Sequence, residues 1–155
     1  KIKQKVNVSI FRPFNVFGPG MPKNDYRVFP RFFSSIKNNK PITIFKKGKQ
    51  TRTFCYVSDA ITAMFLVIIK GNKFVYNIGA DGPEVNMSVL HKNIERSIGK
   101  KVKSKNVNYP KNYPQVEPQR RCPDISKIKK ELKFKNRVSL SESIKRFYYW
   151  SSKYY

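Results

Sequence analysis

The stretch KKGKQTRTFCYVSDA, residues Lys46 to Ala60, passes from a run of cations to an apolar segment. Arg52 stands inside a Thr-Arg-Thr triplet, where the lysine-rich surface has ended. The segment TFCYV that follows is typical of a buried strand, and Ser58-Asp59 is typical of a helix start. A guanidinium carries a fixed, planar fork of donors, which a lysine point charge does not. The stretch therefore raises the question whether Arg52 binds a ligand or simply ends a charged surface.

Working outward from this stretch, hydrophobic periodicity predicts alternating strands and helices. The predicted strands lie at residues 6–11, 41–45, 53–57 and 74–79, and the predicted helices lie at residues 26–38, 58–69, 88–98, 125–132 and 140–147. Pro30 must fall in the first turn of its helix. The helix at 58–69 is apolar nearly all round, so we expect it to be buried. The pattern predicts one domain of the α/β class.

Composition restricts the classes of function. The chain has 155 residues and a formal net charge of +24. That charge could neutralise nucleic-acid phosphates, but the lysines are scattered from Lys1 to Lys153, so we favour a solvated surface over a nucleic-acid face. No apolar run approaches the roughly 18 residues of a membrane helix, so we expect no membrane association. Cys55 and Cys122 lack metal-ligand spacing, so we expect no metal site and a reducing cytoplasm.

The chain lacks the residues that an independent enzyme would need. It has a single histidine and no Ser-His-Asp arrangement. Its glycines never form G-x-G-x-x-G after a strand, which is the dinucleotide-binding fingerprint. A Tyr-x-x-x-Lys sequence occurs at Tyr149 to Lys153, but no strand follows it, and we interpret it as coincidence. The pattern indicates part of a larger catalytic unit.

Four motifs occur in a recognisable order: RPFNVFGPGM, KPITIFKKGKQTRTFCYVSDA, NIG and PQRRCPDISKIKKEL. Together they resemble the C-terminal portion of the extended short-chain dehydrogenase/reductase family, the NAD-dependent epimerases, dehydratases and decarboxylases of nucleotide sugars. The run from Arg121 to Ile125 is most similar to the UDP-glucuronate decarboxylases. The resemblance implies that residues 1–155 form a substrate-binding lobe with the last strand or strands of a Rossmann-type NAD(P)-binding fold, and that the N-terminal Rossmann half is absent.

The resemblance also implies roles for particular residues. Arg52 matches the arginine of the family's Gln-x-Arg-x-Phe motif, which reaches the nucleotide. Asn15 matches an asparagine that contacts the substrate, and Arg121 matches an arginine that faces the sugar and is implicated in proton delivery. The remaining expected substrate-binding residues are Phe29, Arg31, Phe32, Ile44, Phe45 and Tyr113, and the expected cofactor-binding residues are Val16 and Arg27. Arg31 departs from the small polar residue that is typical of the decarboxylases, and Cys122 replaces a typical lysine.

The expected function follows from this resemblance. It is NAD-dependent conversion of UDP-glucuronate to UDP-xylose through a 4-keto intermediate, with 4-epimerisation or 4,6-dehydration of a nucleotide sugar as alternatives. The expected partners are a UDP-sugar, the Rossmann half and, in the full-length protein, a second copy in a homodimer. From other classes, a basic nucleic-acid-binding module and a non-catalytic scaffold remain open. We expect the 155-residue chain alone to show no turnover.

Overall fold

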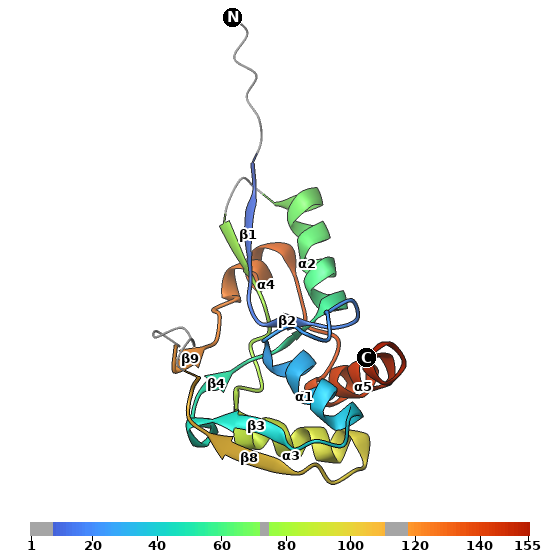
Figure 1. Cartoon of the computed structure of the whole chain (residues 1–155). Coiled ribbons are helices and arrows are strands. Elements are labelled where there is room, and N and C mark those ends of the chain that lie inside the picture. The colour runs from blue at the N-terminus through green and yellow to red at the C-terminus, as the bar shows by residue number, and fades with distance from the viewer. Residues whose placement is uncertain (1–7, 72–74, 111–117) are drawn as a thin grey trace, which may run out of the picture.

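The computed structural model describes residues 8–71, 75–110 and 118–155, in which helices and short strands alternate along the chain (Figure 1). The strands are β1 (Ile10–Pro13), β2 (Val16–Phe17), β3 (Ile42–Phe45), β4 (Thr51–Arg52), β5 (Cys55–Tyr56), β6 (Val75–Ile78), β7 (Val85–Asn86), β8 (Ser104–Val107) and β9 (Arg120–Arg121). The helices are α1 (Val28–Lys37), the 3₁₀ turn η1 (Lys46–Gly48), α2 (Val57–Lys70), α3 (Met87–Ile98), α4 (Ser126–Leu132) and α5 (Leu140–Tyr154). The predicted α/β class is confirmed.

The strands pair mainly in parallel, which requires long connections between partners. β1 pairs with β6, β2 with β5 and β3 with β8, each in parallel. β4 is central in a three-stranded sheet, antiparallel to β7 and parallel to β9. Segments that are far apart in the sequence therefore meet around β4, which contains Arg52.

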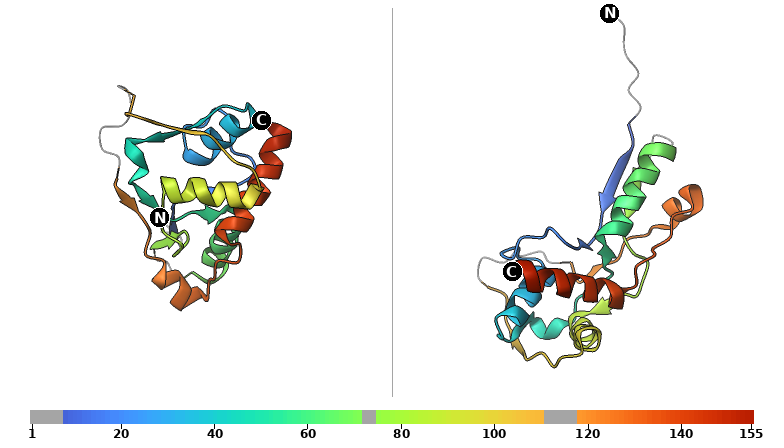
Figure 2. Two further views of the ribbon diagram at one scale, coloured as in Figure 1. Left: turned by 90° about the horizontal axis from the view of Figure 1, so that it is seen from below. Right: turned by 90° about the vertical axis from the view of Figure 1, so that its right-hand side faces the viewer.

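Two apolar clusters hold the elements together. One is rich in phenylalanine and joins α1, α3, α5 and β3, with Phe33 and Phe147 in edge-to-face contact at 5.2 Å. The other joins α2, α4 and β6 around Tyr76, whose hydroxyl donates to Glu131 at 2.8 Å. Figure 2 shows α3 crossing α5, and the Ser97 and Ser141 hydroxyls meet at 3.0 Å between them.

Helix ends follow the local sequence closely. Pro30 lies in the first turn of α1, where backbone N–H groups have no partner within the helix. The Ser139 hydroxyl accepts a hydrogen bond from the backbone N–H of Glu142 at the start of α5. Gly99 ends α3 with a φ of 66°, in the left-handed region that glycine adopts without strain. The helices predicted at residues 26–38, 88–98 and 140–147 are confirmed as α1, α3 and α5.

The prediction that the apolar helix α2 is buried is wrong. Ala60, Ala63 and Val67 face the core, but the opposite side is open, and Ile68 is 70% and Ile69 72% exposed. The reason is that α2 is apolar on two sides, whereas the described elements packed against it, α4, β5 and β6 among them, cover only one. Figure 2 shows α2 at the margin of the molecule.

The first strand also differs from its prediction. It begins at Ile10 and ends at Pro13, later than the predicted 6–11, and residues 1–7 lie outside the described part. Among the described residues β1 pairs only with β6, and each of its four residues is exposed. Within the same described ranges, every helix is too short or too polar to cross a bilayer.

Candidate functional site

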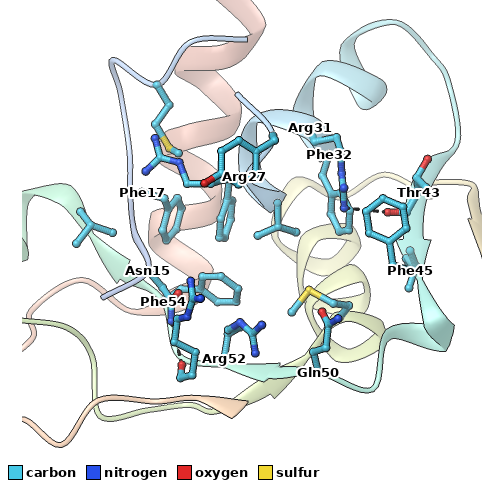
Figure 3. Close-up of a pocket in the computed structure, with 18 of the residues that line it drawn as sticks. Asn15, Phe17, Arg27, Arg31, Phe32, Thr43, Phe45, Gln50, Arg52 and Phe54 are labelled. Atoms are coloured by element: carbon cyan, nitrogen blue, oxygen red, sulfur yellow. Dashed lines mark hydrogen bonds between the residues drawn. The ribbon is translucent and has the colours of Figure 1, made fainter. Parts of the chain in front are cut away.

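A cavity of about 450 Å³ opens between the β1–β2 turn, the start of α1, β3, β4 and β9 (Figure 3). The residues predicted to bind ligand converge on it from these separate segments. Those that line it are Asn15, Val16, Arg27, Phe29, Arg31, Phe32, Ile44, Phe45, Arg52 and Arg121. Tyr113 lies outside the described residues. The structure therefore brings the described candidates into one site.

Arg52 is buried in the wall of this cavity, with only 6% of its surface exposed. Its Nη1 donates to the carbonyls of Thr51 at 2.8 Å and Gln119 at 3.3 Å, and its Nη2 donates to the carbonyl of Pro118 at 2.7 Å. The β4 backbone is itself held on both sides, by β7 and β9. The planar guanidinium is therefore fixed in orientation before any ligand enters.

Asn15 ties three segments of the site together. Its φ of 46° is left-handed, a conformation that asparagine tolerates better than most residues. Its Nδ2 donates to the carbonyl of Thr53 at 2.9 Å and to that of Arg121 at 3.0 Å. Its own carbonyl accepts from the backbone N–H of Cys55 at 3.2 Å. Because both amide hydrogens are engaged within the protein, Oδ1 is the atom of this carboxamide through which a ligand contact remains possible.

Arg121 lies beside Arg52 on the adjacent strand, in register with it, and places a second cation at the same end of the cavity. Its neighbour Arg120 points the other way and donates to Glu84 at 2.8 Å. A hydrogen bond from the Thr51 hydroxyl, joined by the bonds from Arg120, keeps the pKa of Glu84 below its ordinary value. The Glu84 carboxylate is thus engaged outside the cavity, whereas Arg121 lines the cavity.

The other end of the cavity is aromatic. The Arg31 guanidinium stacks over the Phe45 ring at 4.3 Å and donates to the carbonyl of Thr43 at 3.3 Å. The Phe45 ring also packs against Tyr109 at 5.1 Å. Phe29 and Phe32 stand behind this wall and are only 2% and 1% exposed. These two side chains belong chiefly to the core. The planar surface that faces the cavity is therefore formed by Phe45 and Arg31.

The two predicted cofactor-side residues differ in environment. Val16, in β2, pairs with Cys55 and is half-buried. Arg27 is engaged with Asp25, to which its Nη2 donates at 2.5 Å. Hydrogen bonds from Arg27 hold the pKa of Asp25 below its ordinary value, although partial burial of the carboxylate acts in the opposite direction. Arg27 therefore reaches the cavity already paired with a carboxylate.

Gln50 and Met87 also line the cavity and were not predicted as site residues. Gln50 could have been found, since side chains two residues apart on an extended segment share one side, and it precedes Arg52 by two. Met87 could not, because only the packing of α3 against η1 brings it there. Gly48 has a φ of 66°, and a Cβ there would lie 2.8 Å from Ile44 and 3.0 Å from Met87. This close approach holds the loop before Gln50 against α3.

Residues 2–79 match the NAD dependent epimerase/dehydratase family, and this chain belongs to that family. It is 34% identical over 139 residues to UDP-glucuronic acid decarboxylase 3 of Arabidopsis thaliana, covering 90% of this chain and 39% of that protein. It is 33% identical over 147 residues to a UDP-glucuronate 4-epimerase of Thermodesulfobacterium geofontis, covering 94% of this chain and 43% of that protein.

A solved structure has the same fold over nearly the whole chain. It is UDP-glucuronic acid 4-epimerase from Bacillus cereus in complex with UDP-glucuronic acid and NAD, with a TM-score of 0.84 and 29% identity. The match covers 97% of this chain and 46% of that one. The chain thus spans less than half the length of these relatives, which include both decarboxylases and epimerases. The resemblance inferred from the four motifs is confirmed at the level of the family.

Proposed function

We propose that this chain is the nucleotide-sugar-binding part of an NAD-dependent enzyme that converts UDP-glucuronate to UDP-xylose. One observation carries the proposal: a single cavity has Arg52 and Arg121 at one end and the stacked Arg31 and Phe45 at the other. A nucleotide sugar presents two linked phosphates between a planar base and a sugar. Cations and a planar surface, placed in this order, match that ligand. The relatives that act on UDP-glucuronate support the choice of sugar.

In this proposal the binding residues act through prior organisation. Arg52 is already held in orientation by backbone carbonyls, so its positive charge is fixed in the cavity wall and little side-chain freedom is lost when phosphate or ribose oxygens approach it. The sheet and Asn15 fix the backbone of Arg121 in the same way. The stacked pair of Phe45 and Arg31 offers a planar surface against which the uracil lies. Substrate binding in this orientation places the sugar next to β9.

Arg121 is the proposed catalytic residue. When a 4-keto sugar loses CO2, the electron pair of the broken C–C bond leaves negative charge on the carbonyl oxygen. A guanidinium close to the sugar stabilises that charge and orients the proton donor that later restores the C–H bond. NAD, when bound, supplies the hydride acceptance and return at the sugar ring.

The carboxyl ends of β1 and β6 offer a binding place for one end of a dinucleotide. The parallel strands β1 and β6 reach their carboxyl ends beside the cavity, where Pro13 lines it and the Phe14 N–H donates to the Ile78 carbonyl at 2.8 Å. Ligands of open α/β sheets bind at such ends. Val16 and Arg27 would form part of this wall, but the sequence has no glycine-rich loop for the cofactor pyrophosphate.

We therefore assign the rest of the cofactor site to a dinucleotide-binding half. The surface that supports this is the exposed strand β1 together with the outer side of α2. Its exposed apolar residues are Val8, Ile10, Phe11, Ile61, Phe65, Ile68 and Ile69. A further parallel strand would pair with β1, and a helix would cover α2, which removes both the unpaired sheet edge and the apolar surface from water.

Calorimetric titration tests the binding proposal. UDP and UDP-glucuronate should bind the chain with a stoichiometry of one, and Arg52→Ala should abolish binding, whereas Lys153→Ala, at the far end of α5, should not. Salt-sensitive binding of duplex DNA, with no response to UDP, would instead favour a nucleic-acid module. Product analysis after addition of the dinucleotide-binding half tests the reaction: UDP-xylose and CO2 support decarboxylation, and a UDP-sugar that keeps its carboxylate indicates epimerisation.

A further inference from the structure

The strand β9 consists of two adjacent arginines that face opposite sides of a short sheet. Arg121 lines the cavity, whereas Arg120 donates to Glu84 on the other side. Side chains of a strand alternate between two faces, so a shift of one residue along the partner strand exchanges the faces. In β9 such a shift would replace one arginine with the other. The identity of the arginine in the cavity therefore depends on what fixes β9 against β4.

The two possible shifts of β9 are not equivalent. One would bring Arg120 into the cavity and place Gln119 on the outer face. The other would bring Cys122 into the cavity, but Cys122 alone joins β9 to Pro123, which is buried and packs closely against Gly79. That shift would have to stretch the chain beyond the roughly 3.8 Å between consecutive Cα atoms. The first shift only creates slack, which a bulge can absorb. It is therefore the competing arrangement.

Backbone contacts of β9 do not oppose this competing arrangement. The Thr51 N–H donates to the carbonyl of Gln119 at 2.8 Å, and the Asn15 side chain donates to the carbonyl of Arg121 at 3.0 Å. Every residue of a strand carries a carbonyl, so a shifted β9 would offer equivalent acceptors. These bonds hold β9 against β4, but they do not distinguish one arginine side chain from the other.

Glu84 makes the side-chain contact that does distinguish them. It immediately precedes β7, the strand on the other side of β4. Its Oε2 accepts from Arg120 Nη2 at 2.8 Å, and its Oε1 accepts from Arg120 Nε at 3.0 Å and from the Thr51 hydroxyl at 2.6 Å. Thr51 and Arg120 are partners in the pairing of β4 with β9, and Arg52 and Arg121 are the next pair. One carboxylate thus fastens the outer pair.

The geometry of this contact requires an arginine. A guanidinium binds a carboxylate through two N–H groups at once, which fixes its orientation as well as its distance. In the shifted arrangement Glu84 would face Gln119, which carries no charge and no such fork. The side chains of Glu84 and Arg120 are 30% and 64% exposed, so the pair adds little to overall stability. Its consequence is the choice between two arrangements of β9.

We propose that Glu84 is a positioning residue, which binds Arg120 on the outer face and so keeps Arg121 as the arginine inside the cavity. The inference deepens the proposed function and rests on its assignment of Arg121 to the reacting sugar. Glu84 does not line the cavity, so it acts through β9 and not on the ligand. Its loss should therefore impair the reaction more than it impairs substrate binding.

Steady-state kinetics in the presence of the dinucleotide-binding half test this role. Glu84→Gln should lower kcat about 10- to 100-fold, the scale of a displaced catalytic group. KM for UDP-glucuronate should stay nearly the same, because the nucleotide contacts are kept. Asp81→Asn is the matched control, since it breaks another exposed ion pair, with Lys129 at 2.5 Å, outside the cavity; it should leave kcat and KM unchanged. An unchanged kcat in Glu84→Gln would overturn the inference.

Exchange of the two charged residues separates positioning from other roles of the carboxylate. The double variant Glu84→Arg with Arg120→Glu keeps the ion pair and reverses it, so it should recover most of the kcat that Glu84→Gln loses. Arg120→Glu alone places two carboxylates together and should be at least as slow as Glu84→Gln. An exchanged protein that is no faster than Glu84→Gln would mean that Glu84 acts through another contact, and would contradict the proposal.

Urea unfolding without ligand tests the contact independently of the reaction. In a double-mutant cycle, the effects of Glu84→Gln and Arg120→Gln on the unfolding midpoint should be non-additive, whereas those of Glu84→Gln and Arg121→Gln should add. Additive effects in both cycles would refute the selective pairing. If the unchanged chain and the dinucleotide-binding half convert no UDP-glucuronate, the proposed function fails, and the two cycles still decide whether Glu84 selects Arg120.

Discussion

Asn15 offers the sharpest test of how the site is assembled. Its Nδ2 donates to the carbonyls of Thr53 at 2.9 Å and Arg121 at 3.0 Å. Asn15→Gly removes both bonds and keeps the φ of 46° accessible. Two net hydrogen bonds correspond to about 1–3 kcal/mol of unfolding free energy. For a chain of this length, that loss lowers the melting temperature by roughly 2–4 °C per kcal/mol.

Asn15→Ala is the companion variant. It loses the same two bonds and, unlike glycine, keeps a Cβ in the left-handed region without the local hydrogen bonding that lets asparagine adopt it, which costs about 1–2 kcal/mol relative to Asn15→Gly. The order of stability, measured by urea or thermal unfolding, should be the unchanged protein, then Asn15→Gly, then Asn15→Ala. UDP affinity should fall in both variants, because β9 and Arg121 lose a tether. A melting temperature of Asn15→Gly equal to that of the unchanged protein would refute this account of Asn15.

Three further predictions concern binding, pH and the exposed helix. Arg52→Lys should weaken UDP binding about tenfold or more, which is the scale of one charge-assisted hydrogen bond. The reason is that a single ammonium cannot replace a guanidinium fork that three carbonyls hold in orientation. Calorimetry at matched salt measures the affinity, and an unchanged affinity would contradict the prediction. Asp25 has a folded-state pKa below its ordinary 3.8, so its contribution to stability is present above pH 3.8 and is lost as the pH falls through the folded-state pKa. The difference in melting temperature between the unchanged protein and Asp25→Asn should therefore shrink from pH 6 to pH 2.5. A difference that stays constant would count against a stabilising Arg27–Asp25 pair. Ile68→Lys should change the unfolding free energy of the chain by no more than about 0.5 kcal/mol, because the position is exposed. The same variant should abolish pull-down of the dinucleotide-binding half. Normal pull-down would mean that α2 is not part of the contact with that half.

Sequence patterns predicted the elements that are determined locally. The helices α1, α3 and α5 and the position of Pro30 in α1 each depend on residues within one or two turns, so hydrophobic periodicity suffices to predict them. The error at α2 has a different origin. A helix that is apolar all round indicates burial, but the pattern does not say what covers Ile68 and its neighbours.

The candidate site was predictable as a set of residues but not as a geometry. Motif resemblance placed Asn15, Arg52 and Arg121 in one group, and the structure brings them to one cavity. Their hydrogen bonds join residues up to 106 positions apart, and no local pattern encodes them. That the Gln50 amide has no hydrogen-bond partner among the described residues likewise depends on side-chain packing, which single-sequence reasoning does not reach.

The most direct test of the central claim is a crystal structure of the chain with UDP bound. The account predicts the diphosphate within hydrogen-bonding distance of the Arg52 and Arg121 guanidiniums, with the uracil against Phe45 and Arg31. Density for UDP outside this cavity, or inside it with the diphosphate turned away from Arg52, would contradict the claim that this arginine holds the nucleotide.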